Sequence, residues 1–577
     1  MADPSSSAIQ PPPALRKSIL KVFTKKYSLQ LDSSAISFIA QTLDSHGLLD
    51  QPDEWEDAIE ALAGGIVEAE ATGGKLSLSG SVVTQAALEK VYAQLVVEDS
   101  AAGTETAESR QDPQSHNYLH HHHDITDGER PNPEKYFNVV DAFKMPRVVF
   151  DQKRKVFEKS NVPPTILPMA SSRPAYLRER LGILKNIVLR NENFLPPLAV
   201  GEGRRRDAFM KLTSTKNLLG RQGQRFLLFG MLSTSHDGQY VLEDADGVVG
   251  LDLEEAIPGE GIFTEGSFIL VEGEYTEEER MRVFAIGHPP SESRREARLL
   301  CGHVDFLGTG AITLKDEDAF RVHEKAHDEL CMVVISDLHL DHAKTMSNFR
   351  AILQGYVDAE FIPFAFILCG DFSSSPWSGS DVVKKYQDSF VQLADLIGSF
   401  PEVVKKSHFV IVPGPSDPFA SPTVPRPALA EVFTAPLKRK MGDRVHLASN
   451  PCRITYLGQE IVVYRDDLMA RMLRNTVSLK DEVREGDLKK FLVSTLLDQA
   501  HLCPLPQQVR PILWEFDHSL RLYPMPTALV LADKYDRFEL TYEGCNVFNP
   551  GSFRGSSYGW TTYYPATGKA ERSELPQ

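Results

Sequence analysis

The first hundred residues carry apolar side chains at the three- and four-residue spacing of amphipathic helices. Three stripes share this spacing: Ile36, Ile39 and Leu43; Trp55, Ile59, Leu62 and Ile66; and Leu88, Val91 and Leu95. A single amphipathic helix leaves its apolar face exposed, so these helices must pack against one another. We therefore expect a small all-α domain over residues 1–98.

Residues 99–135 lose this periodicity. Ser, Thr, Glu, Asp, Pro and His dominate the segment, and large apolar residues are few. Such a composition buries too little apolar surface to offset the entropy lost on ordering, and it predicts a flexible linker. The run His120, His121, His122 and His123 lies inside it. Histidine runs in low-complexity segments are more often compositional than metal-binding, so we assign no site to this one.

The spacing changes to that of short strands between residues 224 and 287. Five apolar runs are separated by turns rich in Gly and Asp: 226–229, 240–242, 248–253, 268–271 and 283–286. Five such strands predict a barrel of the OB type over residues 206–298. A basic, helical stretch precedes it. We expect residues 136–205 to form a helical lead-in that packs on the C-terminal core.

From residue 331 onward the chain alternates apolar strands with helices. Four runs end in polar clusters: 331–335, 364–368, 408–412 and 527–531. This alternation is typical of an α/β domain in which helices cover a buried sheet, and it predicts such a domain over residues 299–577. Functional groups of α/β domains gather at the carboxyl ends of the strands, where these clusters lie.

Charge limits the classes of partner. The 577 residues include 62 Lys and Arg against 79 Asp and Glu, a net charge of −17. Residues 226–287 contain 14 acidic and 2 basic residues, a local charge of −12. Because binding to a phosphate backbone depends on Lys and Arg, this barrel favours protein contact or a structural role over single-strand binding, which stays open as an alternative.

Three further patterns bear on the location of the protein. The longest apolar runs fall well below the roughly 18 residues that cross a bilayer. The N-terminus has no apolar core behind a positive start, so it does not resemble a secretory signal. The six cysteines lie far apart without a C-x-x-C pair, which argues against a disulfide framework. We expect a protein that stays inside the cell.

The strand ends of the C-terminal domain resemble those of calcineurin-like metallophosphoesterases, in which β-sandwiches are flanked by helices. Asp337, His339 and Asp371 match the first metal ligands of that fold by position. The resemblance implies that an Asn and a His should follow, but Pro415 and Ser416 occupy those positions. Three recognisable ligands cannot hold the two cations that activate water in such sites. The sequence therefore predicts a degenerate site with no catalytic residue, no bound metal and no cofactor.

An OB barrel joined to a degenerate phosphoesterase domain resembles the B subunits of eukaryotic replicative DNA polymerases. Five short segments, 240–244, 263–265, 271–273, 530–536 and 549–553, look like the epsilon branch of that family. The resemblance implies a nuclear, non-catalytic subunit that binds the C-terminal region of the polymerase catalytic subunit. It also implies that the N-terminal helical domain, similar to the C-terminal part of an AAA+ module, reaches the GINS part of the replicative helicase. Contact with DNA would be indirect or weak.

Two further alternatives remain open from the sequence. The first is an active metal-dependent phosphoesterase or nuclease, which motif order favours and which Pro415 and Ser416 oppose. The second is the equivalent subunit of the delta or alpha polymerase instead of epsilon.

Overall fold

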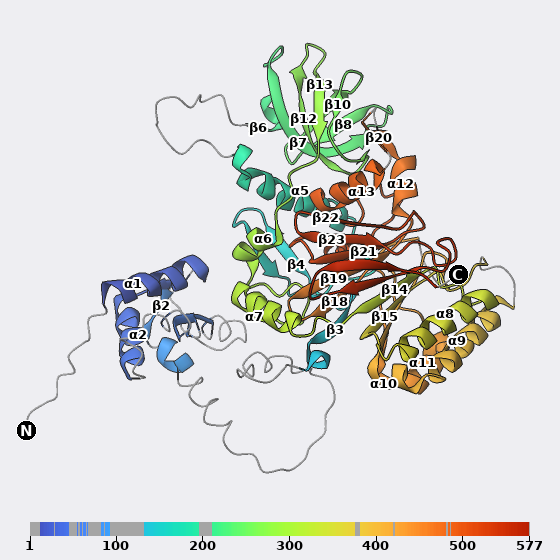
Figure 1. Cartoon of the computed structure of the whole chain (residues 1–577). Coiled ribbons are helices and arrows are strands. Elements are labelled where there is room, and N and C mark those ends of the chain that lie inside the picture. The colour runs from blue at the N-terminus through green and yellow to red at the C-terminus, as the bar shows by residue number, and fades with distance from the viewer. Residues whose placement is uncertain are drawn as a thin grey trace, which may run out of the picture. The chain divides into compact units, whose positions relative to one another are not determined.

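The computed structural model divides the chain into two compact units, Met1–His116 and Asn117–Gln577 (Figure 1). In the first unit the structure describes residues 12–27, 29–45, 55, 58–60, 62–64, 66, 82–85 and 87–92. In the second unit it describes residues 132–194, 211–375, 381–418, 422–480, 483–484 and 486–575. Each unit has a buried apolar core of its own.

The N-terminal unit is built around helices. Its first elements are α1 (Pro13–Leu20), the π-helical turn η1 (Lys21–Lys26) and α2 (Ser33–Ser45). Asp32 caps α2, because its carboxylate accepts the Ala35 N–H at 2.6 Å. The described members of the three predicted stripes are all buried in one cluster, while Leu95 lies outside the described residues. A two-residue parallel pairing of β1 (Gln30–Leu31) with β2 (Val82–Val83) was not predicted.

The expected lead-in over residues 136–205 is only partly helical. It begins with three strands, β3 (Phe137–Asp141), β4 (Val148–Asp151) and β5 (Val156–Lys159), and its helix is α5 (Ser172–Arg190). The prediction was wrong here because β3 and β4 are short, and their valines lie among polar residues, so no long apolar run marks them as strands. β3 pairs antiparallel with β18 (Cys452–Tyr456), so the C-terminal domain takes a strand from outside residues 299–577.

The barrel forms from the five predicted strands. In spatial order they are β13 (Arg280–Gly287), β12 (Phe268–Tyr275), β7 (Arg225–Thr234), β8 (Tyr240–Glu243) and β9 (Val248–Asp252). Parallel pairing of β13 with β9 closes the ring. The short strands β6 (Leu212–Thr213) and β10 (Ile257–Pro258) join at its edges. Outside the ring, β11 (Phe263–Thr264) pairs with β20 (Thr476–Ser478) of the C-terminal domain.

The C-terminal domain contains two six-stranded sheets. The first runs β17 (Val445–Leu447), β16 (His408–Val412), β15 (Ala365–Cys369), β14 (Met332–Ser336), β24 (Trp560–Tyr564) and β25 (Lys569–Ser573). The second runs β22 (Phe538–Tyr542), β23 (Cys545–Asn549), β21 (Ala528–Ala532), β19 (Gln459–Arg465), β18 and β3. The inward side chains of both sheets share one apolar cluster, so the sheets pack face to face.

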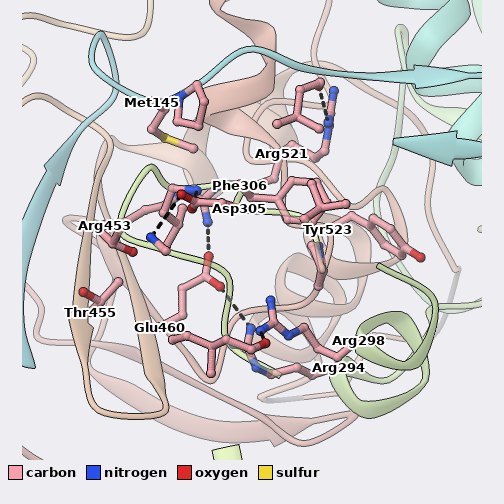
Figure 2. Close-up of a pocket in the computed structure, with 18 of the residues that line it drawn as sticks. Met145, Arg294, Arg298, Asp305, Phe306, Arg453, Thr455, Glu460, Arg521 and Tyr523 are labelled. Atoms are coloured by element: carbon pink, nitrogen blue, oxygen red, sulfur yellow. Dashed lines mark hydrogen bonds and ion pairs between the residues drawn. The ribbon is translucent and has the colours of Figure 1, made fainter. Parts of the chain in front are cut away.

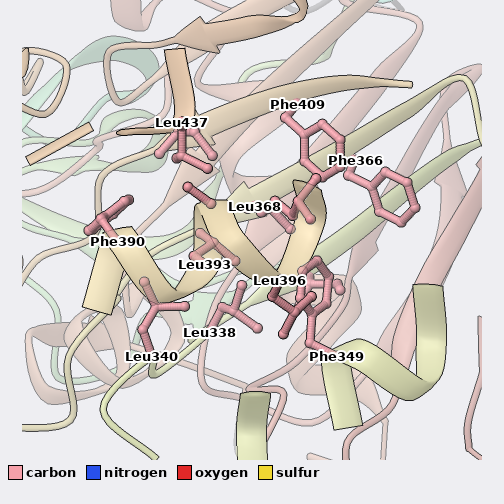
Figure 3. Packing of buried hydrophobic residues seen from close by; sticks show 14 of the residues in the cluster. Leu338, Leu340, Phe349, Phe366, Leu368, Phe390, Leu393, Leu396, Phe409 and Leu437 are labelled. Carbon is pink, nitrogen blue, oxygen red and sulfur yellow. The ribbon is translucent and has the colours of Figure 1, made fainter. Parts of the chain in front are cut away.

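Helices cover the outer faces of both sheets (Figure 1). The first sheet is covered by α8 (Ala343–Asp358), α9 (Val382–Gly398), α10 (Pro401–Lys406) and α11 (Glu431–Met441). The second is covered by α12 (Leu468–Arg474) and α13 (Asp487–Asp498). Alternation along β14 explains the layering: Val333 and Ile335 face the helices, and Met332 and Val334 face the other sheet. Figure 3 shows the helix-side core, where Phe390 and Leu393 of α9 pack among strand residues such as Phe409.

The helices α6 (Arg294–Cys301) and α7 (Leu314–Lys325) connect the barrel to β14. None of the helices that the structure describes combines the length and apolar character that a bilayer span needs. The predicted combination of an OB-type barrel with a mixed α/β domain is confirmed.

Candidate functional site at the strand ends

The structure brings two of the predicted site residues together at the carboxyl ends of β14 and β15. Asp337 follows β14 with a φ of 55°, and Asp371 follows β15. Both are buried, and the Asp371 N–H donates to Asp337 Oδ1 at 3.2 Å. Because β14 and β15 are parallel neighbours, their ends meet at one edge of the sheet.

A residue that the sequence analysis missed, Arg465, lies between these carboxylates. It ends β19, and its side chain is 0% exposed. Its Nη2 lies 2.6 Å from Asp337 Oδ1 and 3.6 Å from Asp371 Oδ2, while Nη1 lies 2.8 Å from Asp467 Oδ1. Its Nε donates to the Gly370 carbonyl at 2.6 Å. Each guanidinium nitrogen therefore has an acceptor.

A second cation, Lys534, stands at the rim. Its Nζ lies 3.5 Å from Asp371 Oδ2 and 3.5 Å from Asp467 Oδ2, and its side chain is 48% exposed. We call Asp337, Asp371, Arg465, Asp467 and Lys534 the strand-end cluster. Burial raises the pKa of Asp337, but Arg465 and Lys534 outweigh burial, so the pKa lies below its ordinary value.

The positions expected to carry Asn and His lie in the loop after β16. The side chains of Pro415 and Ser416 add no ligand, and the Ser416 N–H donates to Asp371 Oδ1 at 2.7 Å. The next residue, Asp417, is buried and accepts hydrogen bonds from Phe372 N at 2.8 Å and Tyr386 Oη at 2.9 Å. Burial and, second, the charge of Asp371 raise the pKa of Asp417 to about 7. Asp417 thus holds the loop in place.

His339 and Asp533 complete the neighbourhood. His339 is half-buried, and burial lowers its pKa although nearby carboxylates oppose the shift. Asp533 accepts the Met469 N–H at 2.8 Å and the Tyr535 N–H at 2.9 Å, so both of its oxygens are used within the chain. Burial raises the pKa of Asp533 to about 6. These contacts give Asp533 a structural role at the end of β21.

The donor set does not fit a pair of divalent metals. Arg465 already pairs with Asp337 at 2.6 Å and lies 3.6 Å from Asp371, so a positive charge already stands beside both carboxylates. A divalent ion added beside this buried positive charge would be strongly repelled. In the part of the chain that the structure describes, no three His, Cys, Asp or Glu side chains are arranged to hold a metal ion.

Family models match both parts of the second unit. The model that describes the B subunit of DNA polymerases alpha and epsilon matches residues 332–540, which span most of the two-sheet domain. The model described as DNA polymerase epsilon subunit 2-like, OB-fold domain, matches residues 170–290, which span α5 and the barrel. The barrel and the two-sheet domain together therefore define a polymerase B-type subunit.

Relatives of nearly the same length identify the branch. This chain is similar to the B subunit of DNA polymerase epsilon from Schizosaccharomyces pombe, with 34% identity over 96% of this chain and 94% of that protein. It is also similar to the DNA polymerase epsilon subunit 2 of Homo sapiens, with 33% identity over 98% of this chain and 99% of that protein. The chain belongs to the family of DNA polymerase epsilon subunit 2. The prediction of the epsilon branch is confirmed, and the delta and alpha alternatives are set aside.

Among solved structures, an archaeal phosphodiesterase aligns with 43% of this chain and 100% of its own chain, at 10% identity and a TM-score of 0.22. A likeness of this size says nothing about the chemistry of the present chain.

Proposed function

We propose that this chain is a non-catalytic, architectural subunit of the DNA polymerase epsilon holoenzyme in the nucleus, where it serves chromosomal DNA replication. Its two-sheet domain is interpreted as a calcineurin-like phosphoesterase fold that has lost its chemistry. Family membership supports the assignment to the holoenzyme.

One observation carries the non-catalytic interpretation. Arg465 is fully buried and pairs with Asp337 at 2.6 Å at the place where a phosphoesterase needs metal ligands. Without a divalent cation nothing lowers the pKa of a bound water enough to make it a nucleophile at neutral pH. The vestigial positions Asp337, His339 and Asp371, with Pro415 and Ser416 in the adjoining loop, then serve the architecture of the strand ends.

The partner is proposed to be the C-terminal region of the polymerase catalytic subunit. The barrel exposes acidic side chains, which disfavour direct binding of a phosphate backbone and leave DNA contact indirect or weak. The exposed acidic residues include Glu254, Glu255, Glu277, Glu278 and Glu279.

A second contact is proposed through the N-terminal helical unit, to the GINS part of the replicative helicase. The predicted linker over residues 99–135 lies almost wholly outside the described residues, as do His120 to His123. A flexible tether of about 37 residues has a root-mean-square span of roughly 30–35 Å, which allows two modules to bind separate partners.

A hydrolysis assay tests the non-catalytic interpretation. The purified chain is incubated with Mn²⁺ or Mg²⁺ and with nucleic acid or a model phosphodiester, beside Asp371→Asn as a control. We expect no turnover above the rate of the Asp371→Asn variant. Metal-dependent turnover that this substitution abolishes would establish an active phosphoesterase and refute the proposal.

Co-purification tests the partner assignment independently. The full chain is co-expressed with the C-terminal region of the epsilon, delta or alpha catalytic subunit. We expect stable recovery only with the epsilon region. In a parallel experiment a chain that lacks residues 1–98 should still bind that region but lose GINS. Recovery with the delta or alpha region alone, or GINS binding without residues 1–98, would contradict the respective assignment.

A further inference from the structure

A second buried charged cluster lies away from the strand ends, in a cavity where the segment after α6 meets the second sheet (Figure 2). Four arginines line it, Arg294 and Arg298 from α6, Arg453 from β18 and Arg521 from the segment after the 3-10 helix Trp514–Leu520. We call these four side chains, with Glu460 of β19, the arginine cavity. No family motif in the sequence points to it.

The cavity walls keep these guanidinium groups out of water. The side chains of Arg298, Arg453 and Arg521 are only 8%, 5% and 6% exposed. Nevertheless, the Nε atoms of Arg294, Arg453 and Arg521 are buried and find no hydrogen-bond partner among the described residues. A buried N–H without an acceptor is costly, and an oxygen atom from outside the chain would remove that cost.

Three glutamates pair with the four guanidinium groups of the cavity, but none of them reaches the unpartnered Nε atoms of Arg294, Arg453 and Arg521. Glu460 lies between two guanidinium groups, 2.6 Å from Arg453 and 3.0 Å from Arg294 (Figure 2). Glu317 pairs with Arg294 and Arg298, both at 3.2 Å, and Glu179 pairs with Arg521 at 2.5 Å. Four guanidinium groups are thus paired with three carboxylates, and with Asp305 at the wall the formal charges sum to zero.

The fourth carboxylate at the wall, Asp305, is used by its own loop. It accepts N–H donors from Leu307 at 3.1 Å, Gly308 at 2.7 Å and Gly310 at 3.0 Å. The pKa of Arg453 is lowered, first by burial and then, against Glu460, by the charges of Arg521 and Arg294. Burial and the two neighbouring guanidinium groups together thus outweigh Glu460 in their effect on Arg453.

We infer that the arginine cavity binds a small tetrahedral oxyanion of the phosphate class, which ties α6, the second sheet and the segment around Arg521 together. The cavity volume of about 40 Å³ sets the size of the ligand. It corresponds to roughly three water molecules, which suits inorganic phosphate or sulfate and leaves no room for a base or a sugar. Guanidinium groups bind such oxyanions through charge-assisted hydrogen bonds.

Thermal unfolding of the full chain at constant ionic strength tests this site, with chloride replaced stepwise by inorganic phosphate or sulfate. We expect Tm to rise with the logarithm of the phosphate concentration above Kd, by about 2–3 °C at a hundredfold excess of phosphate over its Kd. Phosphate and sulfate also stabilise proteins in general through exclusion from the surface, but that effect grows in proportion to the salt concentration and acts on all variants alike.

Two variants and a matched control separate these effects. Arg298→Gln removes one guanidinium while Glu317 keeps Arg294 as a partner, and Thr309→Leu fills the cavity with an apolar side chain. Arg295→Gln makes the same charge change on the exposed face of α6. We expect the logarithmic rise to be lost in the first two variants and kept in the third.

Equal logarithmic responses in all three variants, or a response in the unmodified chain that is only proportional to the salt concentration, would overturn the proposal. If Arg298→Gln fails to fold, Thr309→Leu alone decides, because it leaves every charge in place. Pyrophosphate is the size control. A rise with pyrophosphate that exceeds the rise with phosphate and disappears in Thr309→Leu would contradict the size assigned to the site.

Discussion

The strand-end cluster and the arginine cavity are two buried charged groups in the same domain, and they differ in how completely the chain satisfies them. Arg465 has a carboxylate or carbonyl oxygen for each of its three guanidinium nitrogens. In the arginine cavity three Nε atoms have no partner among the described residues. A guanidinium whose N–H groups all have acceptors gains nothing from a bound anion. One with an unpaired buried N–H is stabilised when a ligand supplies an acceptor.

The difference follows from where the arginines come from. Arg465 ends β19 of the second sheet, and its counter-charges come from the ends of β14 and β15 in the first sheet and from Asp467, two residues further along its own chain. The four arginines of the cavity come from a helix, a strand and an irregular segment, and only Glu460 and two outlying glutamates reach them. The first arrangement is built where regular strands of the two sheets end side by side, and the second is built at a junction of segments.

The largest expected effect comes from removing the saturated guanidinium of Arg465 from the strand-end cluster. Arg465→Met keeps the volume but leaves Asp337, Asp371 and Asp467 close together without their central cation. Removing one partner of a buried ion pair typically costs about 3–5 kcal/mol of unfolding free energy, because the remaining charges stay buried. Urea unfolding at pH 7 measures the loss.

Arg474→Met on the exposed side of α12 is the matched control, and it should change the unfolding free energy by no more than about 0.5 kcal/mol. If both variants unfold at the same urea concentration, the ion pairs of Arg465 do not stabilise the strand ends.

A somewhat smaller effect is expected from the same kind of change in the arginine cavity. Glu460→Gln keeps the shape of the side chain and can still accept one hydrogen bond, but it leaves Arg294 and Arg453 facing each other. We expect a loss of about 2–3 kcal/mol in urea unfolding, part of which phosphate restores. The exposed Glu571→Gln serves as control.

No recovery with phosphate in Glu460→Gln would mean that the cavity does not take an anion even when its positive charge is increased. The strand-end cluster and the arginine cavity would then differ in the geometry of their hydrogen bonds but not in the ability to bind an anion.

Asp498 extends the comparison to a buried carboxylate that has no cation partner among the described residues. Asp498 of α13 accepts a hydrogen bond from Tyr542 Oη at 2.9 Å, and burial raises its pKa to about 7. The folded state therefore keeps a proton that the unfolded chain releases near pH 4, so this group lowers stability progressively as pH rises from about 4 to 7.

Asp498→Asn removes the titration and keeps an oxygen for Tyr542. We expect the variant to gain about 1–2 kcal/mol relative to the unmodified chain between pH 5 and pH 8, measured as the difference in urea unfolding free energy. Asp358→Asn, at an exposed position of α8, should follow the unmodified chain at both pH values. A difference that is the same at pH 5 and pH 8 would show that Asp498 is ionised throughout.

These clusters also show what the sequence could and could not predict. Asp337, His339 and Asp371 were found because each follows an apolar strand, a local pattern that a single sequence displays. Arg465 also follows such a strand, at the end of 461–464, but an arginine in that position usually turns to solvent. Its inward direction is fixed by carboxylates from β14 and β15, which lie about a hundred residues away in the chain. The sequence signal that could have found Arg465 is its position. Residues 465–467 are Arg, Asp and Asp, and they follow an apolar run just as Asp337 and Asp371 do.

The fold shows the same division. The five barrel strands were predicted because Gly-rich turns separate them, whereas β3 was missed because an edge strand of five residues needs its partner β18 to be recognised. Residues 136–205 therefore appeared helical from the one long amphipathic stretch they contain.

The smallest expected effect comes from the rim of the strand-end cluster. Lys534 is half-exposed and lies 3.5 Å from both Asp371 and Asp467, so solvent screens its attraction for them. We expect Lys534→Gln to cost at most about 1 kcal/mol in urea unfolding, and this difference should shrink as salt is added. Lys569→Gln on an exposed strand is the control. A loss as large as that of Arg465→Met, unchanged by salt, would mean that the Lys534 ammonium group stabilises the buried carboxylates as strongly as Arg465 does. The stability of the strand-end cluster would then depend on two cations instead of one.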